Sequence, residues 1–230
     1  MNHGVFSEKM KAADLALANY RLLYVFPCFG LSLGLGESTV RQVCEKNGIS
    51  VALFLLVCNL YTFEEYYPDA GVLRQIPLDE LMQYLRNAHQ DYLNNRMPKV
   101  IAQVMNLTDD GPEQHVRMLM EFCGKYKQEL IVHFDYEEQI VYPYIEKLLE
   151  GGPTGPYKIK EYERNHSNLN AALSDLKNIL IKYLPPECSV EKCRDVLIDL
   201  FLFESDLSKH TLLEDHILIA LVEEIERKIR

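Results

Sequence analysis

Two histidine–glutamate pairs are the first side chains in this sequence whose types and spacing could do chemistry together. They are His133 with Glu137 and His210 with Glu214, both separated by four residues. In a helix this spacing places the two side chains on one face. Each pair taken alone is more typical of a solvent-exposed helix, where it contributes about 0.2–0.5 kcal/mol.

A repeated separation favours the chemical interpretation. His89 precedes His133 by 44 residues, and His166 precedes His210 by the same 44 residues. The local sequences HFDYEEQIVY and HTLLEDHILI also resemble each other. We interpret this as an internal duplication of a helical hairpin, in which the outgoing helix supplies a histidine and the returning helix supplies an HxxxE pair.

Four imidazoles and two carboxylates form a suitable donor set for a pair of metal ions. A carboxylate in a helical core is costly unless it is neutralised, and imidazole with carboxylate suits iron and also zinc or manganese. We expect each metal to take two histidines, each glutamate to bridge the metals with an oxo or hydroxo group, and a position to stay open for a diatomic ligand. The candidate ligands are His89, His133, Glu137, His166, His210 and Glu214.

Long segments with helical periodicity are expected to position these side chains, and strand alternation is absent from the pattern. Loops rich in glycine and proline divide the second part of the chain into four helices, over about 77–106, 112–149, 157–184 and 190–230. Such short loops predict an up-down-up-down four-helix bundle. Pro98 is expected to kink the first helix, because proline removes a hydrogen bond to the preceding turn. Similar chain lengths on both legs of each hairpin place the histidines at one level.

A small helical domain is predicted over residues 1–70, followed by the bundle over 71–230. Its three helices are expected over 7–24, 38–48 and 50–66. Ser7 and Ser50 are plausible N-caps, and Gly48 is a typical C-terminal signal. The apolar face of the third helix indicates either the core of this domain or a homodimer interface.

Composition excludes several classes of partner. The 230 residues include 24 basic and 34 acidic side chains, for a net charge of −10. This balance argues against nucleic acid and against an anionic membrane surface. The polar N-terminus predicts no signal peptide, and the longest apolar run, Ile49–Tyr61, is too short to span a bilayer. We therefore expect a cytoplasmic protein whose six cysteines are mostly buried thiols.

The segments around the candidate ligands resemble those of hemerythrin-like proteins. They are HFDYEEQIVYPYIE (133–146), ERNHSNLNAALSDLK (163–177) and DLSKHTLLEDHILI (206–219). The segment AHQDYLNNRMPKV (88–100) is similar to the first-helix segment of one group, the iron–sulfur cluster repair di-iron proteins. This resemblance implies that one iron binds His89 and His133, the other binds His166 and His210, and both glutamates bridge. Ala220 stands where that family often has proline.

The N-terminal part departs from that family at a loop. Its helices match in length and order, but the vicinal Cys-Cys-Gly-Gly of the family corresponds here to Leu33-Gly34-Leu35-Gly36. Cys28 lies five residues too early to replace those thiols. The departure leaves the candidate metal site untouched and argues against iron transfer through a thiol pair.

The resemblance implies a di-iron protein that repairs iron–sulfur clusters under nitrosative or oxidative stress, with damaged iron–sulfur proteins as partners. The main alternative is a hemerythrin-like protein that binds or senses oxygen or nitric oxide without repair. A redox enzyme and a metal-free interaction module are further alternatives.

The other histidines and several tyrosines near the ligands are not expected to bind the metal. His216 lies six residues after His210 and should face away from it, and we expect His3 and His115 not to be ligands. Four tyrosines near the ligands could line the metal pocket or donate hydrogen bonds to the metal ligands, although core packing is the favoured interpretation. They are Tyr92, Tyr136, Tyr142 and Tyr162.

Overall fold

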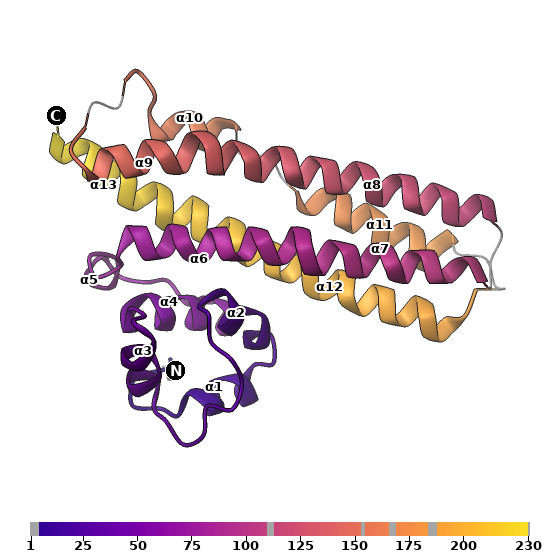
Figure 1. Cartoon of the computed structure of the whole chain (residues 1–230), viewed down its shortest axis with the longest axis horizontal. Helices are drawn as coiled ribbons and strands as arrows, with labels where there is room; N and C mark the ends of the chain where they lie inside the picture. Colours follow the sequence, from indigo (N-terminus) through magenta and orange to yellow (C-terminus); the bar gives the residue numbers. More distant parts are fainter. Residues whose placement is uncertain (1–4, 110–112, 153–154, 166–168, 184–187, 230) are drawn as a thin grey trace. The chain divides into compact units, whose positions relative to one another are not determined.

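The chain is helical throughout the part that a computed structural model describes, which comprises residues 5–109, 113–152, 155–165, 169–183 and 188–229 (Figure 1). The predicted all-α fold is confirmed. Within these ranges, no helix is long and apolar enough to cross a bilayer. The chain divides into two compact units, each described by itself below. The predicted domain boundary at residue 70 stays a prediction.

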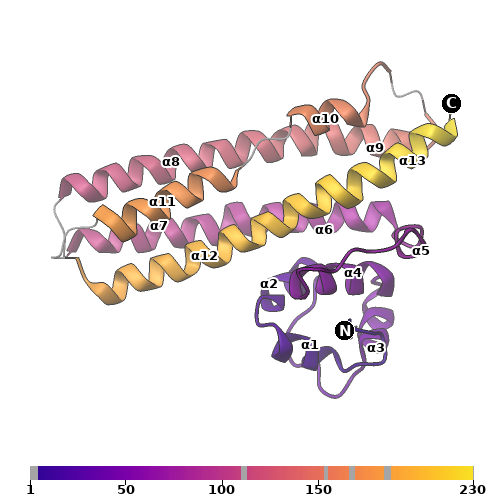
Figure 2. The ribbon, with the colours of Figure 1, turned by 180° about the vertical axis from the view of Figure 1, so that it is seen from behind.

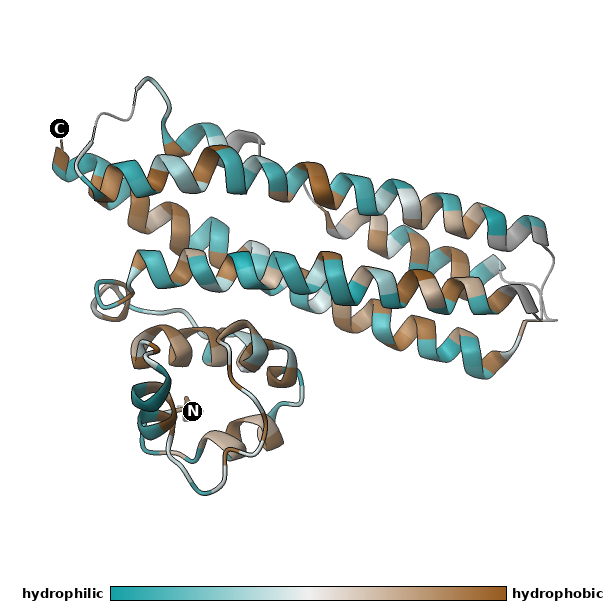
Figure 3. Ribbon diagram, viewed as in Figure 1, coloured by the Kyte–Doolittle hydropathy of each residue, from teal (hydrophilic) through white to brown (hydrophobic). Residues whose placement is uncertain are grey.

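The first unit comprises residues 1–88, 145–160 and 209–230. It begins with five short helices: α1 (Ala12–Ala18), α2 (Leu22–Cys28), α3 (Val40–Asn47), α4 (Val51–Thr62) and α5 (Ala70–Leu73). Nearly every residue of α4 is apolar, and all its side chains from Leu53 to Tyr61 except Leu55 are buried. Figure 3 shows the contrast between this apolar helix and the hydrophilic α3. These buried positions form the core that the sequence predicted for the region.

Two helix boundaries follow from the capping residues that the sequence indicated. Ser50 caps α4, since its hydroxyl accepts a hydrogen bond from the backbone N–H of Leu53. Gly48 ends α3 in the left-handed region, with a φ of 67° that favours glycine. The start of α3 is fixed by a capping box between Thr39 and Gln42.

The prediction of one continuous helix over 7–24 is wrong. Residues 12–28 instead form α1 and α2, and the chain leaves helical geometry at Asn19, whose φ and ψ are −144° and 102°. The Asn19 amide donates to the backbone oxygen of Tyr61 and to the hydroxyl of Thr62. Asparagine side chains that bond backbone groups compete with helix continuation, which accounts for the break.

The first unit also contains most of α6 (Leu78–Asp91), which packs on the N-terminal helices. Glu80 accepts a hydrogen bond of 2.8 Å from the backbone N–H of Ser50, and Asn87 donates one of 2.7 Å to the backbone oxygen of Cys28. The end of α9 (Tyr142–Leu149), η4 (Glu214–Leu218) and α13 (Ile219–Ile229) complete this unit.

The second unit comprises residues 89–144 and 161–208. Four of its helices run side by side with alternating direction (Figures 1 and 2): α7 (Met97–Met105), α8 (Glu113–Tyr136), α11 (Asn170–Tyr183) and α12 (Val190–Leu213). The second unit also contains the short segments η1 (Tyr92–Arg96), η2 (Asn106–Asp109) and η3 (Glu137–Val141), and most of α10 (Ile159–Asn165). The alternating direction of the four long helices agrees with the predicted up-down-up-down arrangement.

Buried ion pairs join the helices of the second unit. Arg96 lies 3.2 Å from Asp206 of α12, and only 7% of Arg96 is exposed. Lys177 of α11 pairs with Glu204 of α12 and is also largely buried. Because a buried charge is costly without its partner, these pairs disfavour other alignments of the helices.

Candidate metal centre

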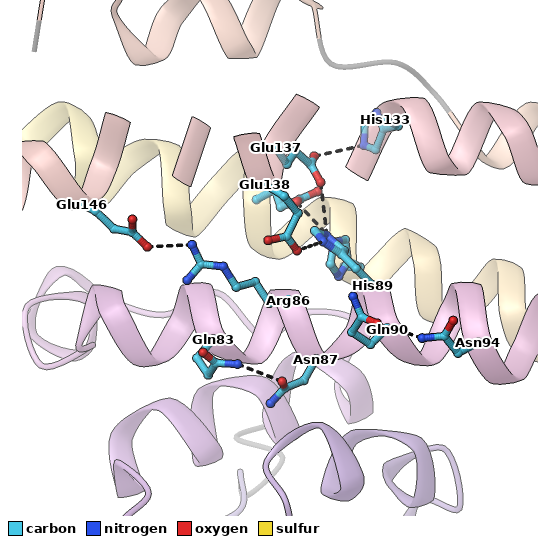
Figure 4. Close-up of polar contacts among 12 residues, drawn as sticks. Gln83, Arg86, Asn87, His89, Gln90, Asn94, His133, Glu137, Glu138 and Glu146 are labelled. Atoms are coloured by element: carbon cyan, nitrogen blue, oxygen red, sulfur yellow. Dashed lines mark hydrogen bonds and ion pairs between the residues drawn. The ribbon is translucent and has the colours of Figure 1, made fainter. Parts of the chain in front are cut away.

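His89 lies near the end of α6 and is held by groups from α8 and η3. Its Nε2 atom is 3.2 Å from Oε2 of Glu137, and its Nδ1 atom is 2.9 Å from Oε1 of Glu138 (Figure 4). The ring of Phe134 stacks on the imidazole, with centroids 4.1 Å apart and planes 12° apart. Only 1% of the His89 side chain is exposed. Contacts on two edges and one face of the imidazole ring therefore fix its orientation.

His133 and Glu137 occupy one helix face, as their spacing predicts. Nε2 of His133 is 3.1 Å from Oε1 of Glu137 (Figure 4). The Glu137 side chain is fully buried, and the phenol of Tyr162 donates a hydrogen bond of 2.7 Å to the same Oε1 atom. The two carboxylate oxygens of Glu137 therefore face two different imidazoles.

The second HxxxE pair repeats this arrangement in another helix. His210 lies in the last turn of α12, and Glu214 is the first residue of η4. Nε2 of His210 is 3.2 Å from Oε1 of Glu214, with exposed fractions of 1% and 0% for the two side chains. Both HxxxE segments thus bury a carboxylate beside an imidazole four residues earlier.

Four of the six candidate ligands form one buried group. One ligand atom from each of these four residues lies within 4.8 Å of the others: His89, Glu137, His210 and Glu214. His133 contacts Glu137 but is not a member of this group. His166, the remaining candidate, falls outside the described residues.

The donor set fits a metal cation. A neutral imidazole donates from only one of its nitrogens. If His89 donates from Nδ1 to Glu138, the lone pair of its Nε2 faces an oxygen of Glu137, and two acceptors repel unless a positive charge lies between them. A divalent or trivalent cation removes that repulsion and offsets the cost of two buried carboxylates. Imidazole nitrogen with carboxylate oxygen suits iron, zinc and manganese.

A wide helical turn accompanies each of the three ligand segments that the structure describes. The three π-helical segments, η1, η3 and η4, begin three residues after His89, at Glu137 and at Glu214. The backbone N–H of Tyr142 bonds the carbonyl of Glu137, five residues earlier, and that of Ile219 bonds the carbonyl of Glu214. Single π-helical turns are frequent at functional sites. Sequence periodicity did not indicate these turns.

These wide turns also explain how the helix accommodates Pro98, which the sequence predicts to kink it. Pro98 and Pro143 each lie two residues after the end of a π-helical segment, at Arg96 and Val141. A proline ring clashes with the carbonyl four residues earlier in a regular helix, and a wider turn relieves that clash. Ala220 occupies the equivalent place after η4, so this turn forms without proline.

Two contacts around the ligands have no signal in the sequence, and a third is the less favoured of two predictions. Phe134 and Glu138 touch His89, and Tyr162 donates to Glu137, whereas the sequence favoured core packing for this tyrosine. The duplicated pattern marked the ligands but not the neighbours that orient them. The exposed position of His216 agrees with its predicted place on the outer face of its helix.

Comparisons with known proteins agree with this geometry. The model of the family described as the hemerythrin HHE cation binding domain matches residues 78–222. An iron–sulfur cluster repair protein YtfE from Edwardsiella ictaluri is 26% identical over 185 residues, which cover 80% of this chain and 82% of the relative. YtfE proteins from Musicola paradisiaca and Yersinia pestis are 23% and 24% identical, over 89% and 80% of this chain and 92% and 82% of their own lengths.

Proposed function

Because the chain belongs to the hemerythrin family of HHE cation-binding domains, we propose that it holds two iron ions joined by an oxo or hydroxo bridge. The proposed ligands are His89, His133, Glu137, His166, His210 and Glu214. Such an iron pair, when bound, supplies one-electron redox chemistry and exchangeable coordination positions. We propose that it serves the repair of iron–sulfur clusters under nitrosative or oxidative stress in the cytoplasm.

The observation that best supports this proposal is the buried group of four donor atoms within 4.8 Å of one another. The fold shields this group from bulk solvent, since all four side chains are at most 1% exposed. They also place imidazole and carboxylate donors together in pairs, as iron prefers. The names of the similar proteins support the repair role and suggest damaged iron–sulfur proteins as partners.

The N-terminal loop indicates that repair would proceed without a thiol pair. Gly34 and Gly36 keep positive φ values of 92° and 58°, so the glycine-dependent turns of the loop are present. Leu33 is 71% exposed, where the repair family carries a cysteine. Cys28 is buried, and its thiol lies 3.3 Å from the backbone oxygen of Tyr24. The proposed repair therefore depends on the metal site and not on this loop.

A reconstitution assay tests the repair proposal. An iron–sulfur dehydratase inactivated by nitric oxide is incubated anaerobically with the iron-loaded chain, and its recovered activity is measured. We expect more recovery than an equal amount of free ferrous iron gives, and no such excess with the Glu214→Ala variant. Recovery equal to that with free iron would contradict the repair role.

Binding of oxygen or nitric oxide without repair is a second candidate function, and the leucines at the loop favour it. It predicts that the absorption spectrum of the reduced, iron-loaded chain changes when nitric oxide is added and returns when the gas is removed. A spectrum that does not change, together with successful dehydratase recovery, would leave repair as the supported role.

A further inference from the structure

Tyr162 contacts the candidate centre from a helix that carries no assigned ligand among the described residues. It lies in α10 and is 1% exposed. Its hydroxyl donates to Oε1 of Glu137 at 2.7 Å, a distance typical of a strong hydrogen bond to a carboxylate. Twenty-five residues separate the two side chains, so this contact depends on the fold and not on local helix geometry.

The carboxylate of Glu137 needs such a restraint. Its Oε1 atom faces Nε2 of His133 at 3.1 Å, and its Oε2 atom faces Nε2 of His89 at 3.2 Å. The terminal torsion of a glutamate is broad, so the plane of the carboxylate is the least determined part of this arrangement. A donor fixed on one oxygen sets that plane, and with it the direction of the other oxygen.

The phenol is itself held in place. The ring of Tyr136 stacks on that of Tyr162, with centroids 6.4 Å and planes 26° apart. At the start of α10, Glu226 accepts a hydrogen bond of 2.9 Å from the backbone N–H of Ile159, which satisfies a free donor of the first turn. Tyrosine has few rotatable bonds, so a buried and stacked ring presents its hydroxyl in a defined direction.

We infer that Tyr162 is a positioning residue of the centre, which orients the Glu137 carboxylate so that its two oxygens face different imidazoles. This inference rests on the proposed iron site and deepens it, since it assigns a role to a side chain outside the ligand set. Groups that orient metal ligands commonly change metal affinity by about 10–100-fold when they are removed.

The test is the variant Tyr162→Phe, which removes the hydroxyl and keeps the ring. Its matched control is Tyr126→Phe, since Tyr126 is equally buried and its hydroxyl has no hydrogen-bond partner among the described residues. Ferrous iron affinity is measured anaerobically by competition with a chelator. We expect a loss of about 10–100-fold for Tyr162→Phe and no loss for the control.

An infrared measurement separates positioning from general packing. In the metal-free chain, the carboxylate band assigned to Glu137 by its absence in Glu137→Gln should shift in Tyr162→Phe and stay in place in Tyr126→Phe. Equal affinities and an unshifted band would overturn the inference while leaving the iron centre intact. Absence of iron from the wild-type chain would contradict the proposed centre instead, and the infrared band would still decide the Tyr162 contact.

A third result would overturn the positioning role differently. If Tyr162 bound ferric iron directly as a phenolate, the oxidised wild-type chain would show a visible charge-transfer band that is absent from Tyr162→Phe. We expect no such difference, because the hydroxyl donates to Glu137.

Discussion

The two HxxxE segments carry the same pair of side chains in different surroundings. After His133 come Phe134, which stacks on His89, and Glu138, which contacts the other edge of that imidazole. The equivalent residues after His210 are Thr211, which is partly exposed, and Asp215, which is exposed. Both segments nevertheless enter a π-helical turn at the glutamate. The shared backbone therefore accompanies the ligand pair in both copies, and the first copy also supplies two of the groups that contact His89.

The largest expected difference concerns Phe134. Truncation to alanine removes a buried aromatic ring against His89 and should lower the free energy of unfolding by about 3–5 kcal/mol. Thr211→Ala changes a partly exposed side chain, so its effect should stay within about 0.5 kcal/mol. Urea unfolding of the metal-free chain measures both. Similar losses of unfolding free energy in the two variants would mean that the residue after the histidine contributes equally to stability in both copies.

Proline substitution tests whether the wide turn of the second copy resembles that of the first. Ala220→Pro places a proline two residues after η4, where Pro98 and Pro143 stand after η1 and η3. We expect tolerance or a gain of about 0.4–1 kcal/mol, because proline restricts the unfolded chain.

The matched control is Ala102→Pro, at an exposed position inside α7, which should cost about 3 kcal/mol. Thermal and urea unfolding report both changes. A loss in Ala220→Pro as large as that in the control would show that η4 does not accommodate proline.

A smaller effect is expected from the carboxylate that follows the ligand Glu137. Glu138→Ala removes the group on Nδ1 of His89 and should weaken iron binding by about 10–100-fold, or about 1.4–2.7 kcal/mol. The control variant Glu150→Ala removes an exposed carboxylate and should leave the affinity unchanged. Chelator competition under anaerobic conditions measures the two affinities. Equal weakening would indicate an effect of net charge and not of orientation.

Much of this arrangement could be predicted because it follows from short-range rules. Caps such as Ser50 and Gly48 mark helix ends, and a four-residue spacing determines the shared face of His133 and Glu137. The helices of the second unit were found from their periodicity and from the glycine and proline between them. The repeated separation of 44 residues is enough to mark His89 as a candidate ligand.

The remaining features depend on contacts between distant segments or on departures from ideal periodicity. Tyr162 reaches Glu137 across 25 residues and Glu138 reaches His89 across 49, and the rotation of each helix decides such contacts. A period of 3.6 residues contains no signal for the turn at η4. The helix break at Asn19 arises from bonds to Tyr61 and Thr62, more than forty residues away.

Metal analysis of the anaerobically purified chain, combined with its Mössbauer spectrum, tests the central claim most directly. The account predicts two irons per chain in a coupled, bridged pair, and loss of that signal in the Glu137→Ala and Glu214→Ala variants. A chain that binds no iron, or that binds as much in these variants as in the wild type, would contradict it.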